Sequence, residues 1–205
     1  MKRIITLVRH GKIDGPAALY GHTDVPLSAQ GYQDLRGTIA RIHHRLAITN
    51  IVSSPLIRCA QLAQEFSDEM NLPLHIIDDL KEMHFGTWDG EPFDNFSEAQ
   101  WRELDQFWQT PNTAQPPGGE ALPLFAQRVV NAWRLIQQAQ QPHQLVICHG
   151  GVIRIIIAHL LHLDWTNPAL FRQLTIDYAS NTCVEILDHE NALPTIRHIG
   201  ENLNS

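Results

Sequence analysis

The chain has 205 residues, of which 43% are hydrophobic and 18% are charged, so it has the composition of one folded domain with a buried core. Its formal net charge of −7 disfavours general binding to nucleic acid, and an anionic substrate must be held by individual arginine or histidine side chains. No apolar stretch has membrane-spanning length, and the first apolar run is too short for a signal peptide. We therefore expect a cytoplasmic protein with neither nucleic acid nor a membrane as a partner.

Strand and helix signals alternate along the first part of the chain. Residues 4–8 form a short apolar run rich in β-branched side chains, which predicts a buried strand. Ser28 has the side chain of a helix cap, and apolar residues follow it at helical spacing. Residues 50–53 predict a second strand, Pro55 opens a second helix, and residues 74–77 give a weaker third strand.

The middle of the chain is irregular and rich in aromatic residues, proline and glycine. Between residues 84 and 120 we expect a short cap-like insertion, with loops around one helix over residues 97–109 that Ser97 caps. A second long helix is predicted over residues 121–140.

The end of the chain returns to alternating elements. Residues 145–148 predict a strand, two glycines lead into a helix over residues 152–161, and residues 182–187 and 195–199 predict a closing pair of strands joined by a turn at residues 188–191. This order predicts one three-layer α/β/α domain over residues 1–205, with a mostly parallel central sheet covered on both faces.

Cysteine and histidine give no sign of disulfides or of a metal. The three cysteines are odd in number, far apart and flanked by apolar residues, which is typical of reduced thiols in a core: Cys59, Cys148 and Cys183. Two histidine pairs stand close in sequence, but neither has Cys, Asp or Glu at ligand spacing: His43 with His44, and His159 with His162. We therefore predict no metal and no cofactor.

Three segments carry polar residues directly after a predicted strand. They contain Arg9-His10-Gly11, Arg58 in the segment that begins at Ser53, and His149-Gly150-Gly151. In open α/β sheets, sites form outside the carboxyl ends of the strands, where helix N-termini also attract anions. We expect the three segments to converge on one anion-binding crevice.

The same segments resemble the histidine phosphatase superfamily, also called phosphoglycerate mutase-like, over nearly the whole chain. The motifs stand in one order: Leu7-Val8-Arg9-His10-Gly11, Gly21-His22-Thr23-Asp24, Ser53-Ser54-Pro55-Leu56-Ile57-Arg58, Glu82 with Phe85-Gly86-Thr87-Trp88-Asp89-Gly90, and His149-Gly150-Gly151-Val152-Ile153-Arg154. The resemblance implies a phosphoglycerate mutase-like fold. It also implies a metal-independent phosphomonoesterase that works through a phosphohistidine.

The resemblance assigns roles to five residues. His10 is the nucleophile and must be neutral at the attacking nitrogen. Arg9 and Arg58 clamp the phosphoryl oxygens, and His149 donates a hydrogen bond to the developing charge. Glu82 protonates the leaving alkoxide and later deprotonates the attacking water. Without the resemblance, His149 reads as a helix cap and Glu82 as a surface carboxylate.

Further contacts in this region follow from the resemblance alone. His22, Thr23 and Gly150 are expected near the phosphate, although an ordinary turn fits His22 equally well. The loop after the first motif departs from the family, because Lys12 and Pro16 stand at or near positions where many members carry Glu and an Asn that faces phosphate.

The acidic middle region favours hydrolysis over mutase activity. A mutase must hold a bisphosphorylated intermediate, which needs additional cations. Here a single Arg102 stands against five carboxylates: Glu91, Asp94, Glu98, Glu103 and Asp105. A non-enzymatic binding module is disfavoured because all the central catalytic groups are present.

Within the family, the chain most resembles the α-ribazole-5′-phosphate phosphatases of cobalamin nucleotide-loop assembly. Length, the Glu–Phe-Gly–Asp-Gly stretch and Pro116-Pro117-Gly118-Gly119-Glu120 carry this resemblance. It implies a small phosphomonoester substrate whose benzimidazole stacks on the aromatic region. A Trp and Phe stripe is also typical of a core, so a broad-specificity or sugar or metabolite phosphatase is the alternative. A homodimer is compatible with the sequence.

Overall fold

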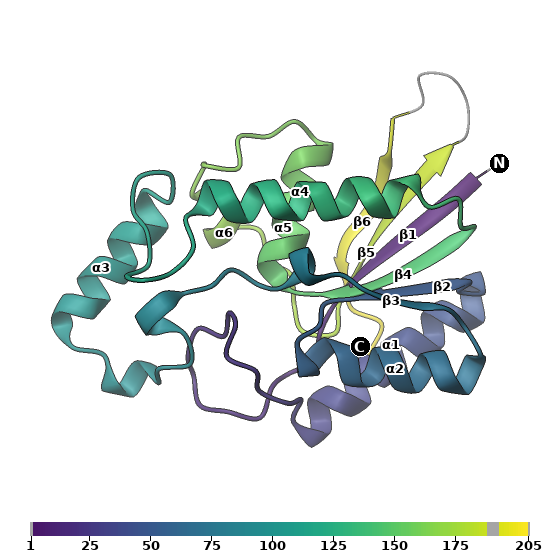
Figure 1. Ribbon diagram of the computed structural model, residues 1–205, viewed down its shortest axis with the longest axis horizontal. Helices are drawn as coiled ribbons and strands as arrows, with labels where there is room; N and C mark the ends of the chain where they lie inside the picture. The colour runs from purple at the N-terminus through teal and green to yellow at the C-terminus, as the bar shows by residue number, and fades with distance from the viewer. Residues whose placement is uncertain (1, 188–192, 205) are drawn as a thin grey trace.

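The computed structural model describes residues 2–187 and 193–204 and contains one six-stranded mixed sheet with helices on both faces (Figure 1). The strand order is β3-β2-β4-β1-β5-β6. Their bounds are β1 Lys2–Arg9, β2 Asn50–Ser53, β3 Leu74–Ile76, β4 His143–Cys148, β5 Asn181–Leu187 and β6 Thr195–Glu201. Strands β1 to β4 are parallel, whereas β5 pairs antiparallel with β1 and β6 antiparallel with β5. The predicted α/β architecture with a mostly parallel sheet is confirmed.

Alternating side chains along the strands divide the core between the two faces. On one face, Leu7 packs in a cluster with Val129 of α4 (Leu122–Gln138) and Val152 of α5 (Gly150–Leu160). On the other, Val8 packs in a cluster with residues of α1 (Ala29–Leu46) and α2 (Ile57–Met70). Figure 1 shows α4 and α5 on one side of the sheet and α1 and α2 on the other. Both clusters consist of buried residues, so the sheet is the middle layer of a sandwich.

Helix ends follow the predicted caps with one exception. Ser28 accepts the N–H of Gly31 at 3.0 Å and begins α1, and Ser97 forms a capping box at the start of α3 (Glu98–Gln109). The prediction that Pro55 opens the second helix is wrong by two residues. The cap of α2 comes from a distant loop, because Asp24 accepts the N–H of Ile57 at 2.7 Å. A local sequence pattern cannot show such a cap.

The segment from residue 84 to residue 120 stands beside the sheet and contains two short 3-10 helices and α3 (Figure 1). The 3-10 helices are η2 (Gly86–Trp88) and η3 (Phe93–Asn95), and a third, η1 (Asp78–Leu80), precedes the segment. Helix α3 is anchored by Phe107, whose ring meets that of Trp88 at 6.0 Å. The short helix α6 (Ala169–Arg172) was not predicted.

Three other sequence-based expectations concern the cysteines, the start of β4 and a turn. The three cysteines are buried and free, as expected. Strand β4 begins two residues earlier than predicted, at His143. The turn expected at residues 188–191 lies outside the described residues. Among the helices in the described part of the chain, none has the length and apolar character needed to cross a bilayer.

Candidate active site

The three polar segments converge at the carboxyl ends of β1, β2 and β4, as predicted. The rings of His10 and His149 lie 5.1 Å apart, edge to face. Arg58 enters from the first turn of α2, and its Nε lies 3.4 Å from Nδ1 of His149. Because Arg58 and His149 have no exposed surface and His10 has 6%, the three side chains form a buried polar cluster.

His10 is held in the form that a nucleophile requires. Its Nδ1 lies 2.8 Å from the carbonyl oxygen of Gly11, which can only accept, so Nδ1 carries the proton and Nε2 keeps its lone pair. Burial holds the pKa of His10 well below its ordinary value, and the charges of Arg58 and Arg9 lower this pKa further. The hydrogen bond to Gly11 has the opposite, smaller effect on the pKa. The ring is therefore neutral at neutral pH.

Arg58 is fixed by backbone carbonyls of the loop that precedes α1. Its Nη1 donates to Thr23 at 3.0 Å, and its Nη2 donates to Tyr20 at 3.1 Å and to Gly21 at 2.6 Å. These bonds, with the contact to His149, hold the guanidinium in one orientation beside His10.

Asp89 in turn fixes this loop. Its carboxylate accepts the backbone N–H groups of Gly21, His22 and Thr23 at 3.0, 2.7 and 3.0 Å. Burial alone would raise the pKa of Asp89, but hydrogen bonds from Thr23, His22 and Phe85 lower it overall. The structure thus places His22 and Thr23 in the loop that holds the guanidinium of Arg58. Direct contact of either side chain with phosphate stays a prediction.

Arg9 is oriented by the segment that leads into β5. Its Nη1 donates to the carbonyl of Ile176 at 2.7 Å, and its guanidinium lies 3.8 Å from the ring centre of Tyr178. Its Nε is buried without a hydrogen-bond partner in the described part of the chain. A buried donor without a partner is costly, and a bound oxyanion would satisfy it.

His149 is the N-cap residue of α5, but its ring does not cap the helix. Its Nε2 lies 2.8 Å from Oγ of Ser54, and its Nδ1 faces Arg58. Burial holds the pKa of His149 well below its ordinary value, and the charges of Arg58, His10 and Arg9 add to the effect. The side-chain capping alternative is therefore wrong, and the ring belongs to the polar cluster.

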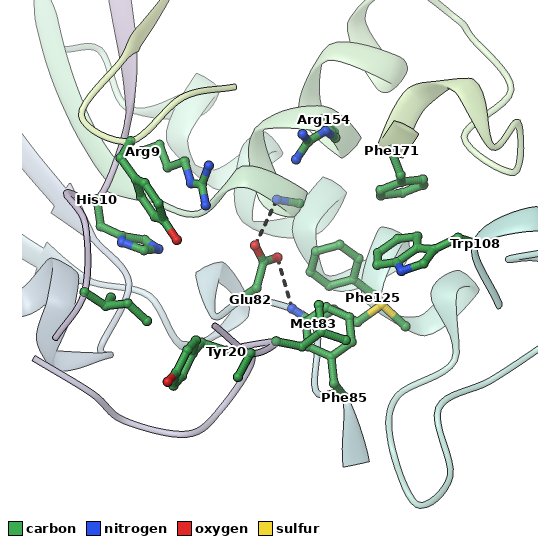
Figure 2. A pocket seen from close by; sticks show the side chains of 15 residues that line it. Arg9, His10, Tyr20, Glu82, Met83, Phe85, Trp108, Phe125, Arg154 and Phe171 are labelled. Carbon is green, nitrogen blue, oxygen red and sulfur yellow. Dashed lines mark hydrogen bonds between the residues drawn. The ribbon is translucent and has the colours of Figure 1, made fainter. Parts of the chain in front are cut away.

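Glu82 is held at the N-terminus of α5. Its Oε2 accepts the N–H of Gly151 at 2.9 Å, and its Oε1 accepts the N–H of Met83 at 3.1 Å (Figure 2). A β-carbon on Gly151 would lie 2.3 Å from Oε1, so only glycine lets the carboxylate approach the helix end. A β-carbon on the neighbouring Gly150 would lie 3.0 Å from Nη1 of Arg154 and 3.5 Å from Nε of Arg9, which puts Gly150 between two cations.

Arg9, His10 and Glu82 line a cavity of about 180 Å³ with two chemically different ends (Figure 2). We call the first the charged end; it contains Arg9, His10, Glu82 and Arg154. We call the second the aromatic end; it contains Phe85, Trp108, Phe125 and Phe171. Figure 2 shows Glu82 between His10 and the aromatic rings, which is where a leaving group would lie.

Among the residues that line this cavity, Arg154, Phe171 and Tyr178 are functional candidates to which the sequence assigned no role. Arg154 lies one helical turn after Gly150, so helical spacing could have indicated it. Tyr178 reaches His10 because the N–H of the next residue, Ala179, donates to the carbonyls of Arg9 and His10 at 3.1 Å each. No sequence signal marks that long-range contact, or the approach of Phe171 to Trp108 at 5.8 Å.

Comparison with known proteins bears directly on this arrangement. The sequence model of the Histidine phosphatase superfamily (branch 1) matches residues 5–202. The chain belongs to this superfamily. It is 30% identical over 161 residues to the adenosylcobalamin/alpha-ribazole phosphatase of Escherichia coli K12, a match that covers 76% of this chain and 77% of that relative. Membership identifies the protein as a hydrolytic phosphatase, as the motifs predicted.

Solved structures with the same fold cover almost the whole chain. YhfR of Bacillus stearothermophilus superposes with a TM-score of 0.85 at 23% identity, covering 97% of each chain. The alpha-ribazole phosphatase from Shigella flexneri superposes with a TM-score of 0.79 at 25% identity, covering 97% of this chain and 96% of that one. The predicted phosphoglycerate mutase-like fold is confirmed.

The loop that departs from the family pattern has a structural role in this phosphatase. The carbonyl of Lys12 accepts both the N–H and the hydroxyl of Ser28, at 2.9 and 3.1 Å, and the carbonyl of Pro16 accepts the hydroxyl of Tyr20 at 2.9 Å. The side chains of Lys12 and Pro16 are exposed. Within residues 2–187 and 193–204, no group of three or more His, Cys, Asp or Glu side chains is arranged to hold a metal ion.

Proposed function

We propose that this phosphatase hydrolyses α-ribazole 5′-phosphate through a phosphohistidine on His10. The observation that carries the proposal is that one cavity joins the charged end to a wall of aromatic rings. The 30% identity to a relative named adenosylcobalamin/alpha-ribazole phosphatase supports this proposal.

In the first step, the lone pair on Nε2 of His10 attacks phosphorus and the bond from phosphorus to the 5′-oxygen breaks. Arg9, Arg58 and His149 stabilise the charge on the phosphoryl oxygens in this proposal, and the buried Nε of Arg9, which has no partner in the described part of the chain, is available to bind them. Glu82 gives its proton to the departing 5′-oxygen, which lies on the aromatic side of the phosphate in this proposal.

In the second step, water attacks the phosphohistidine. Glu82, now a carboxylate, takes a proton from that water as the new bond to phosphorus forms. The bond between phosphorus and Nε2 breaks, its electron pair returns to His10, and phosphate leaves. Cationic side chains supply the charge stabilisation throughout, so we propose that the reaction needs neither a metal nor a cofactor.

The aromatic end suits a planar base as the distal half of the substrate. Phe85 and Phe171 flank Trp108 with ring centres at 6.4 and 5.8 Å, so a flat, apolar ring finds aromatic contacts there. At the charged end, Arg154 donates from Nε to the carbonyl of Leu174 at 3.0 Å, and Figure 2 shows its guanidinium directed into the cavity. We propose that it binds the ribose hydroxyls.

The test compares two substrates that differ only in the base: α-ribazole 5′-phosphate and ribose 5-phosphate. We expect Trp108→Ala to lower kcat/KM for the ribazole ester about 10-fold and to leave ribose 5-phosphate nearly unchanged, since stacking of a base on an aromatic side chain is worth about 1–3 kcal/mol. Trp101→Ala is the matched control, because Trp101 lies on the same helix but packs on Phe93 and Phe96. Equal activity of the native enzyme on both substrates would instead favour a broad-specificity sugar phosphatase.

A further inference from the structure

Arg128 on α4 does not line the cavity, yet it donates five hydrogen bonds, three of them to the chain around Glu82. Its Nε and Nη2 bind the two carboxylate oxygens of Glu120 at 2.7 and 2.8 Å. Its Nη1 donates to the carbonyls of Asp79 and Lys81 at 2.9 and 2.7 Å, and its Nη2 also donates to the carbonyl of Glu82 at 2.9 Å. Three carbonyls of the segment that carries Glu82 therefore converge on one guanidinium.

Glu120 fixes the chain on the other side of Glu82. Its Oε2 accepts the N–H of His84 at 3.3 Å, and its own N–H donates to the carbonyl of His84 at 2.8 Å. The side chains of Arg128 and Glu120 are only 18% and 15% exposed, so water competes weakly for these bonds. The backbone is thus tied both before and after Glu82.

The hydrogen bonds of Arg128 and Glu120 limit where the carboxyl group of Glu82 can lie. Its Oε2 accepts the N–H of Gly151 of α5, whereas its backbone carbonyl accepts a hydrogen bond from Nη2 of Arg128 on α4. The two helices pack against each other in the same buried cluster. The positions of both helices therefore determine where the carboxyl group of Glu82 would lie relative to the oxygen of a bound phosphoester.

We infer that Arg128 and Glu120 are positioning residues, which we call the clamp, and that they place the carboxyl group of Glu82 for proton transfer to the leaving oxygen. The inference rests on the acid role of Glu82 in the proposed function. Geometry of this kind matters because a displacement of about 1 Å can cost about 10²-fold in rate.

A positioning role differs from a general structural role in its dependence on the leaving group. An alkyl alcohol must be protonated as it leaves, whereas 4-nitrophenolate leaves readily without an acid. A displaced Glu82 should slow the alkyl ester selectively. Damage to the whole site, or loss of the charge of Arg128 near His149, should slow both esters alike.

The experiment measures single-turnover phosphorylation rates for ribose 5-phosphate and 4-nitrophenyl phosphate. Arg128→Gln should lose about 10- to 100-fold on the alkyl ester and less than about 3-fold on the nitrophenyl ester. Glu120→Gln should show a smaller loss of the same selectivity, and it carries the test if Arg128→Gln does not fold by circular dichroism. Arg128→Lys keeps the charge but cannot make five bonds, and should also lose selectively. Arg134→Gln, an exposed change on the same helix, is the matched control and should behave like the native enzyme.

Glu82→Gln separates the inference from the proposal on which it rests. If Glu82→Gln shows no selective loss on the alkyl ester, the acid role fails and the clamp fails with it. If Glu82→Gln is selective but the clamp variants slow both esters equally, or slow neither, the clamp alone is overturned. In the Glu82→Gln background, Arg128→Gln should add no further selective loss, because the group that it positions is already inactive.

Discussion

The charged end and the aromatic end of the cavity are built in different ways. Beside the charged end, His10 follows β1, Arg58 lies in the first turn of α2 and His149 precedes α5. Hydrogen bonds hold these side chains, as three carbonyls hold Arg58. At the aromatic end, Trp108 of α3 and Phe171 of α6 meet through ring packing, and Phe125 of α4 lines the same end. The polar cluster is thus built by short segments at one sheet edge, whereas the aromatic end depends on how distant helices pack.

The first prediction removes Arg58 from the buried polar cluster beside the charged end. Arg58→Ala should lower kcat/KM about 10²–10³-fold for the ribazole ester and for ribose 5-phosphate alike, because both esters carry the same phosphoryl group. Steady-state kinetics on the two substrates measure the effect. Arg36→Ala, which removes an exposed ion pair with Glu69, should change neither rate. A loss confined to the ribazole ester would mean that the two ends are not separable.

The second prediction concerns stability at acid pH. Buried His143 has its Nε2 2.9 Å from Oγ1 of Thr6, and burial lowers its pKa to about 4, as it lowers the pKa of His10 and His149. The unfolded chain protonates near the ordinary pKa of about 6.5, so below that pH it binds more protons than the folded chain. Stability is therefore fully present above about pH 6.5 and is lost as pH falls toward 4.

For His143 alone, the loss amounts to about 3 kcal/mol across this window. Urea unfolding of the native protein and of His143→Gln, at pH 7 and pH 4.5, measures it. The native protein should lose more stability than the variant. Trp108→Ala should keep the native pH dependence, since the aromatic end holds no buried histidine among its four residues. Equal pH dependence of the native protein and His143→Gln would contradict this prediction.

The smallest expected effect is that of a chelator, which should leave the rate unchanged. Arginine side chains provide the positive charge beside His10, so the proposed reaction uses no divalent ion that a chelator could remove. The rate on ribose 5-phosphate before and after treatment with EDTA tests this point. Loss of activity that Mg²⁺ or Zn²⁺ restores would contradict it.

The same contrast explains what could be predicted from the sequence. His10, Arg58 and His149 were predictable because each follows a short apolar strand, and parallel strands bring their carboxyl ends to one edge. The capping of α2 by Asp24 and the support of the loop by Asp89 were not, since they join residues that are far apart in the chain. The aromatic region was predicted to contact the substrate. The rings that line the cavity come from different helices, and no periodic pattern in the sequence identifies which of them lie together.

The central claim is that His10 is the group that carries the phosphoryl intermediate. Acid- and base-quenched incubation with ³²P-labelled ribose 5-phosphate, followed by peptide mapping, tests it most directly. We predict one phosphate that is labile in acid and stable in base, on the peptide that contains His10, and none in His10→Ala. Label on a different residue, or full turnover by His10→Ala, would contradict the account.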